Sequence, residues 1–108
     1  MSEVADVIRE AFDAAKQASL KTFEKMGGDG YACGFAWVEV KIRRNSKLGK
    51  ELIAHGFRPS YRSGMIDLWN PGGLNVQNID IKEDGAYAFA RVLKEKLGIP
   101  AYAASRMD

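Results

Sequence analysis

The stretch that decides the fold is Tyr31–Ile42, which reads YACGFAWVEVKI. Its residues alternate in character with the period of two that is typical of a β-strand. One face carries Tyr31, Cys33, Phe35, Trp37, Glu39 and Lys41, and the other carries Ala32, Gly34, Ala36, Val38, Val40 and Ile42. The second face is small and then β-branched, which predicts that a helix packs closely against it. The first face is aromatic, and its cover is the main functional question.

Outward from this strand, the pattern predicts an amphipathic helix before it and further helices and strands after it. Helices are expected at 2–26, 46–55 and 82–97, and strands at 31–42, 57–61, 65–69 and 101–105. Ser2 suits the N-cap of the first helix, and the Gly27–Gly30 run suits its C-cap and a turn. Pro59 indicates an edge strand, and Val76–Ile81 fits either a short strand or an extended loop.

This order predicts a single α+β domain that spans residues 1–108. The first helix (1–26) precedes a core (31–108) with the order β-α-β-β-α-β, which is typical of a ferredoxin-like sandwich. A chain of 108 residues with 46% hydrophobic and 28% charged residues can build such a core without disulfides. Cys33 and His55 are the only residues of their types, which excludes an internal disulfide and a Cys/His zinc cluster.

No apolar run approaches the length of a membrane span, and the acidic N-terminus is unlike a signal peptide. We therefore expect a cytoplasmic protein that has no membrane partner and needs no cofactor. The net charge is only +2, but segment 41–62 holds seven basic residues and one acid, a local charge of +6. Such asymmetry indicates an anionic partner. The alternative is that these side chains only discourage aggregation at a sheet edge.

The sequence predicts neither a catalytic thiol–imidazole pair nor a metal site. Cys33 and His55 form the only thiol–imidazole pair, but their spacing does not require contact. We interpret Cys33 as a core residue and His55 as a residue at a helix C-terminus. The candidate cation ligands match no known metal-binding loop; they are Asp67, Asp80, Glu83 and Asp84.

A loop rich in glycine and amide residues follows Trp69. The run Trp69–Gly73, with Asn75, Gln77 and Asn78 after it, has the composition of a small-ligand pocket. The alternative is a wide turn whose amides satisfy backbone groups of the loop. We favour the turn.

Segment Cys33–Val40 resembles the first ribonucleoprotein octapeptide of RNA-recognition domains. The matching positions are Gly34, Phe35, Ala36 and Val38, with Trp37 as an aromatic substitute. Cys33 stands where that family has a basic residue, and Val40 stands where it has an aromatic one. The resemblance implies that Phe35 and Trp37 stack on bases. In that family an aromatic strand precedes the octapeptide, whereas a helix precedes it here.

We expect the N-terminal helix to fold over this aromatic face and bring Phe12 or Phe23 onto Phe35 or Trp37. Burial of two or three such rings would contribute several kcal/mol, at roughly 25 cal/mol per Å² of apolar area. A second subunit would provide similar cover. Without either, the aromatic face lies open to solvent.

From Tyr31 onward the chain also resembles a group of small uncharacterised bacteriophage proteins. The segments that carry this resemblance are Ala32–Val38, Leu68–Pro71, Val76–Asn78 and Ala101–Arg106. It implies a phage-like origin and residence in the host cytoplasm or the virion. It implies no activity, because the group has none assigned.

These observations predict a non-enzymatic protein that binds nucleic acid through a basic edge. The residues expected to contact phosphates are Lys41, Arg43, Arg44, Lys47, Lys50, Arg58 and Arg62. Those expected to stack on bases or line a pocket are Phe35, Trp37, Tyr61 and Trp69. The alternative is a protein–protein or self-assembly module that uses the N-terminal helix or the aromatic face, with a second copy or a host protein as partner.

Overall fold

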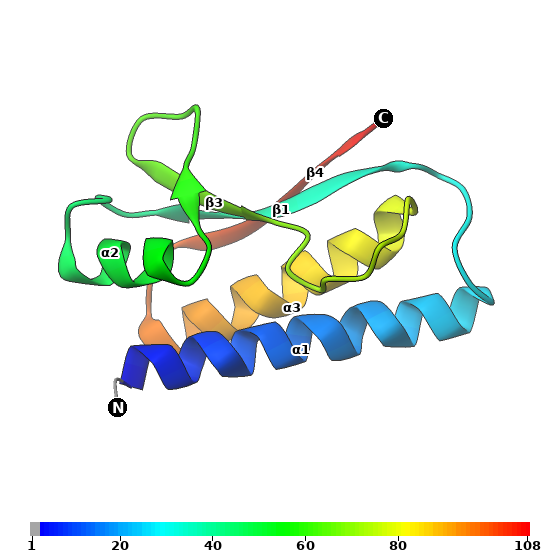
Figure 1. Ribbon diagram of the computed structural model, residues 1–108, viewed down its shortest axis with the longest axis horizontal. Coiled ribbons are helices and arrows are strands. Elements are labelled where there is room, and N and C mark those ends of the chain that lie inside the picture. Colours follow the sequence, from blue (N-terminus) through cyan, green and yellow to red (C-terminus); the bar gives the residue numbers. More distant parts are fainter. Residues whose placement is uncertain (1–2) are drawn as a thin grey trace.

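The computed structural model describes residues 3–108 and has a four-stranded antiparallel sheet with helices on one side (Figure 1). This confirms the predicted α+β class. The elements are α1 (Glu3–Met26), β1 (Gly34–Lys41), α2 (Lys47–Ala54), β2 (Arg58–Pro59), β3 (Met65–Trp69), α3 (Ile79–Leu97) and β4 (Ala101–Met107). The expected N-cap at Ser2 lies outside the described residues.

β1 is a central strand, because the strands are ordered β2-β3-β1-β4 and every neighbouring pair is antiparallel. Its register places Trp37 opposite Trp69 on β3 and opposite Ala104 on β4. Glu39 lies opposite Asp67 in the same way. Side chains directly opposite one another point to the same face of a sheet. The register therefore gathers the aromatic and acidic residues of β1 and β3 on one face.

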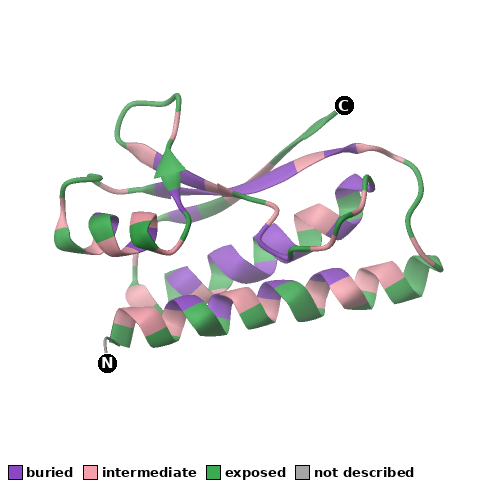
Figure 2. Cartoon of the chain, viewed as in Figure 1, coloured by how far each residue is buried: buried purple, intermediate pink, exposed green. Residues whose placement is uncertain are grey.

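The other face of β1 is covered by α3, as the small and branched residues predict. Ala36, Val38 and Val40 are buried there in one core cluster with Phe89 and Leu93 of α3. Figure 2 shows this buried layer between the sheet and the helices. Small side chains on the strand let the helix approach closely, and burial of its apolar stripe stabilises the pair.

The expectation that the N-terminal helix covers the aromatic face is wrong. α1 packs along α3, on the side of α3 away from the sheet (Figure 1). Phe12 meets the ring of Phe89 edge-on, with 4.9 Å between centroids, rather than the ring of Phe35 or Trp37. The physical reason is the small-residue side of α1, where Ala11 and Ala15 are fully buried. Such residues favour close helix–helix contact.

One close contact fixes α1 against α3. The Ser19 hydroxyl is buried and donates to the Ile81 carbonyl at 2.8 Å. A Cβ atom on Gly85 would lie 2.5 Å from that hydroxyl oxygen, and one on Gly72 would also collide with it. Because the two glycines lack side chains, α1, α3 and the loop after β3 meet at a single point.

Local hydrogen bonds set the ends of the helices. Ser46 caps α2 and accepts from the Gly49 amide at 3.0 Å. Asn78 caps α3 and accepts from the Ile81 amide, so this helix begins at Ile79 rather than at residue 82. Segment 76–81 is therefore not a strand of its own, although Asn78 forms an isolated bridge with Cys33. The Gly27 and Gly28 amides bond to carbonyls of the last turn of α1, which confirms the predicted cap.

Three strands have different lengths from those expected. β1 begins at Gly34 rather than Tyr31. β2, which was expected over 57–61, contains only Arg58 and Pro59 and lies at the sheet edge. Pro59 lies on an edge strand as predicted, because proline has no amide to donate to another strand. β4 is longer than expected and reaches Met107.

Candidate nucleic-acid interface on the open face of the sheet

The face of the sheet opposite α3 carries the aromatic residues, and neither α1 nor α3 covers it (Figure 1). We call it the open face. The register assigns to it Phe35, Trp37, Glu39, Lys41, Met65, Asp67, Trp69, Arg58, Tyr102, Ala104 and Arg106. The turn between β2 and β3 rises above this face.

Two stacked indoles form the centre of the open face. The rings of Trp37 and Trp69 lie 4.6 Å apart between centroids, at 16° between their planes. Phe35 meets Trp69 edge-on at 5.9 Å. Trp37 is only 9% exposed, whereas Trp69 is 40% exposed. The cover of Trp37 is therefore its neighbour Trp69, and Trp69 is the aromatic side chain that this cluster presents to solvent.

Each tryptophan has an acidic partner two residues away on its own strand. Trp37 Nε1 donates to Glu39 Oε1 at 3.0 Å, and the Trp69 side chain lies near Asp67, where it favours the ionised carboxylate. Burial raises the pKa of Asp67 above its ordinary value, and Arg58, Trp69 and Ser60 oppose that shift. The hydrogen bond to Glu39 therefore holds the Trp37 indole in a fixed orientation.

Cations flank the aromatic centre at both ends. At one end Lys82 Nζ lies 5.3 Å from the centre of the Phe35 ring, and the Arg106 guanidinium lies 5.5 Å from it. Both distances suit a cation–π interaction. At the other end Arg62 Nη1 reaches Glu39 Oε2 at 3.4 Å. A chain of bases on the indoles would therefore meet positive charge in either direction.

The structure brings three of the seven predicted basic residues into one groove. Arg43, Arg44 and Arg62 line it together with the exposed ring of Tyr61, between the β1–α2 loop and the β2–β3 turn. Its volume is about 560 Å³. We call it the basic groove. Of the remaining four, Lys41 and Arg58 lie on the open face, and Lys47 and Lys50 lie on α2, outside the groove. All seven are exposed.

Sequence reasoning missed two cations of this surface, Lys82 and Arg106. Lys82 is a residue of α3 that reaches Phe35 and also donates to the Gly34 carbonyl at 2.9 Å. Only the tertiary packing of α3 reveals that contact. The sequence pattern could have indicated Arg106. It alternates with Tyr102 and Ala104 along β4, which places all three on one face of the sheet.

The thiol–imidazole pair is not assembled. Cys33 Sγ donates to Gln77 Oε1 at 3.4 Å, just before β1. His55 follows α2, and its Nδ1 lies 2.9 Å from the Glu51 carbonyl. The two side chains therefore bond to different segments of the chain.

Two of the acids considered as cation ligands bond to separate partners. Asp84 accepts from Thr22 and Glu83 accepts from Ser105. Among residues 3–108, no group of three His, Cys, Asp or Glu side chains is placed to hold a metal ion. The loop after β3 is a turn, because Asn70 Nδ2 donates to the Leu74 carbonyl at 2.9 Å.

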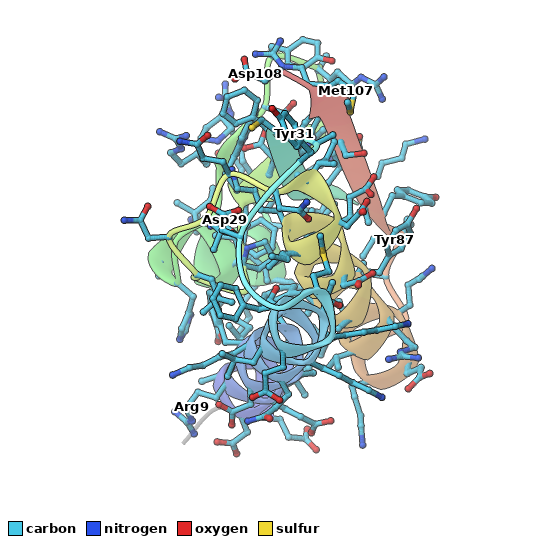
Figure 3. The ribbon with its side chains drawn as sticks, turned by 90° about the vertical axis from the view of Figure 1, so that its right-hand side faces the viewer. Arg9, Asp29, Tyr31, Tyr87, Met107 and Asp108 are labelled. Atoms are coloured by element: carbon cyan, nitrogen blue, oxygen red, sulfur yellow. The ribbon has the colours of Figure 1, made fainter. Side chains whose placement is uncertain are left out.

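Asp29 fastens the loop after α1 to the segment before α3. Its carboxylate accepts from the amides of Gln77, Asn78 and Gly30 at 2.9 to 3.1 Å. These bonds, that from Gln77 foremost, hold the pKa of Asp29 below its ordinary value. Figure 3 shows Asp29 and Tyr31 on this loop. This contact positions the start of β1, and with it Phe35.

Comparisons with known proteins found no similar family model, curated protein or solved structure. In the described part of the chain, no helix has the length and apolar character needed to cross a membrane. What the fold and the site define is thus an α+β domain with an open, aromatic and cation-flanked sheet face.

Proposed function

We propose that the protein is a non-enzymatic binder of single-stranded nucleic acid, with bases on the open face and phosphates along the basic groove. The observation that carries the proposal is the exposed indole of Trp69. Trp37 stacks on it and Phe35 meets it edge-on, so it needs no rearrangement to receive a base. Preorganisation of this kind lowers the entropic cost of binding.

Stacking explains why a single strand fits better than a duplex. An unpaired base has a free π-face, and base–aromatic stacking contributes about 1–3 kcal/mol per base. In a duplex, neighbouring bases already occupy those faces. The cations at each end of the aromatic cluster supply the sequence-independent attraction for phosphate, which weakens with salt.

The two carboxylates of the open face do not oppose this proposal. Glu39 and Asp67 are buried beside Arg62 and Arg58, respectively, which offset their charge. Phosphates would lie over the cationic ends, away from these acids. The acids are therefore compatible with bases at the centre of the face.

The test is fluorescence anisotropy of a labelled single-stranded oligonucleotide at low salt, with the matching duplex alongside. We expect the wild-type protein to bind the single strand more tightly. Trp69→Ala and the triple variant Arg43→Ala, Arg44→Ala, Arg62→Ala should both weaken binding. The triple variant should also flatten the dependence of log Kd on log salt, by about 0.7 for each phosphate that is no longer neutralised.

A matched control removes three cations elsewhere. Lys21, Lys25 and Arg91 line a groove between α1 and α3, on the opposite side of α3 from the open face. Their triple alanine variant has the same net charge as the groove variant and should bind almost normally. Absence of binding by the wild-type protein, or equal weakening in both triple variants, would contradict the proposal.

We also propose that the core is ferredoxin-like and that the protein has a phage-like origin. After α1, the order β-α-β-β-α-β and the sheet order β2-β3-β1-β4 support a ferredoxin-like core. The resemblance from Tyr31 onward supports a phage-like origin, with the protein in the host cytoplasm or the virion. An experimental structure tests the first point, and the genomic neighbourhood of the coding sequence tests the second.

A further inference from the structure

The two edges of the sheet differ in their protection against another strand. At one edge, β2 has only two residues, and one of them is Pro59. At the other edge, β4 runs over Ala101–Met107 without a proline, and Arg106 is its single charged residue. Short strands and prolines block edge pairing, whereas a long edge with little charge invites it. Within residues 3–108, β4 has a neighbouring strand only on the β1 side.

The register shows which backbone groups of β4 point outward. The Lys41 amide bonds to the Pro100 carbonyl, and the Asp108 amide bonds to the Cys33 carbonyl, each at 3.1 Å. In an antiparallel pair such hydrogen-bonded positions recur at every second residue. Even-numbered residues of β4 therefore bond to β1. The outward groups belong to Ala101, Ala103, Ser105 and Met107.

We propose that β4 pairs with β4 of a second copy, antiparallel and about a two-fold axis, to form one continuous sheet. The favoured register centres on Ala104. The outward groups then match each other, Ala103 with the partner's Ser105 and Ala101 with the partner's Met107. This inference is independent of nucleic-acid binding.

Side chains on the open face are complementary in this register. Tyr102 lies beside the partner's Arg106, an arrangement suited to a cation–π contact, and the two-fold axis repeats it. Ala104 lies beside the partner's Ala104, where small side chains leave room for the backbones to approach. A strand that matches its own copy in this way favours an isologous dimer over an unrelated peptide.

Exposed large apolar side chains gather along the same edge. Tyr102 is 51% exposed and Met107 is 62% exposed, both on β4, and Tyr87 on α3 is 61% exposed. Figure 3 shows Tyr87 and Met107 along the β4 side of the molecule. A partner strand would shield this edge, and removal of apolar surface from water would stabilise the dimer. Both open faces would then lie on the same side of the joined sheet.

The test measures molar mass by light scattering over a wide range of protein concentration, without nucleic acid. We expect a species of twice the 11.9 kDa chain mass. Tyr102→Arg should yield the single-chain mass, because it places two arginines beside each other on both sides of the axis. Its own fold should persist, because residue 102 lies opposite Glu39 on β1, where a positive charge is favourable.

Two controls keep the outcome specific to β4. Tyr61→Arg changes an exposed tyrosine of the β2–β3 turn in the same way and should remain dimeric. Hydrogen exchange should show protected amides at Ala103 and Ser105 in the dimer. Ser105→Pro removes one of these outward amides and should also give the single-chain mass. A wild-type protein that is monomeric throughout, or a dimer with rapidly exchanging β4 amides, would overturn the proposal.

Discussion

The two faces of the central strand β1 have the same backbone but different chemistry. On the covered face, Ala36, Val38 and Val40 are buried in the core beneath α3. On the open face, Trp37 and Glu39 are also buried, but Trp69 stacks on Trp37, and Glu39 bonds to Trp37 and pairs with Arg62. The first face is closed by a helix and the second by its own aromatic and charged groups.

The difference shows that burial alone does not identify the core. A residue shielded by a helix meets solvent only when the fold opens. A residue shielded by an exposed neighbour such as Trp69 is one side-chain movement from solvent or ligand. We therefore expect substitutions on the covered side to change stability, and substitutions of exposed residues on the open side to change binding.

Phe89→Ala should have the largest effect on stability. Its ring is fully buried and packs against the rings of Phe12 and Phe57. Such a truncation costs about 3–5 kcal/mol in the free energy of unfolding, measured by urea denaturation. Phe35→Ala on the open face is the matched comparison and should cost clearly less, because Phe35 is only half-buried. Equal costs would contradict the separation of the two faces.

Gly85→Ala should cost about 1–3 kcal/mol by overpacking the point where α1 meets α3. The added Cβ atom would lie 2.5 Å from the Ser19 hydroxyl oxygen. Removal of that oxygen by Ser19→Ala should recover part of the stability, so the double variant should be more stable than the sum of the single effects. Full additivity would show that the two residues do not interact at this point.

The smallest effects concern pH and have opposite signs at two aspartates. The pKa of Asp67 is raised in the folded state, so its ionisation lowers stability as pH rises above its ordinary value of 3.8. Asp67→Asn should therefore raise the melting temperature at neutral pH, with a difference that vanishes in acid. The pKa of Asp29 is lowered, so its contribution is present above 3.8 and is lost as pH falls through the folded-state value.

Asp29→Asn should accordingly lower the melting temperature at neutral pH and have little effect in acid. Melting curves of the two variants and the wild type, recorded across the same pH range, check both signs together. We assign Asp67 as a carboxylate that burial destabilises and Asp29 as one that hydrogen bonds stabilise. Melting temperatures that shift in the same direction for both variants at neutral pH would contradict this assignment.

The alternation in Tyr31–Ile42 was enough to predict the covered face of β1 and the α+β class. It was not enough to place α1, because an apolar stripe indicates burial but not the partner. The small residues Ala11, Ala15 and Ser19 favoured a close helix partner, and Gly85 supplied it 66 positions after Ser19. Such a match depends on three-dimensional packing that a local pattern does not contain.

The candidate site was predictable only in part, because its contacts also depend on three-dimensional packing. Phe35, Trp37 and Trp69 were expected on aromatic strands, and the structure places them in one cluster. The interactions of Lys82 and Arg106 with Phe35 join residues far apart in sequence. The stacking of Trp37 on Trp69 depends on the register of β1 against β3, which the sequence spacing does not determine when α2 and β2 lie between them.

We propose above all that Trp69 on the open face receives an unpaired base. Titration of the wild-type protein with a single-stranded oligonucleotide should quench tryptophan fluorescence, and Trp69→Ala should weaken binding by about 1–3 kcal/mol, or roughly 5- to 150-fold in Kd. The variant should lose some free energy of unfolding, because Trp69 stacks on Trp37 and meets Phe35, but it should stay folded, which urea denaturation checks. Unchanged affinity in a folded Trp69→Ala protein would contradict the account.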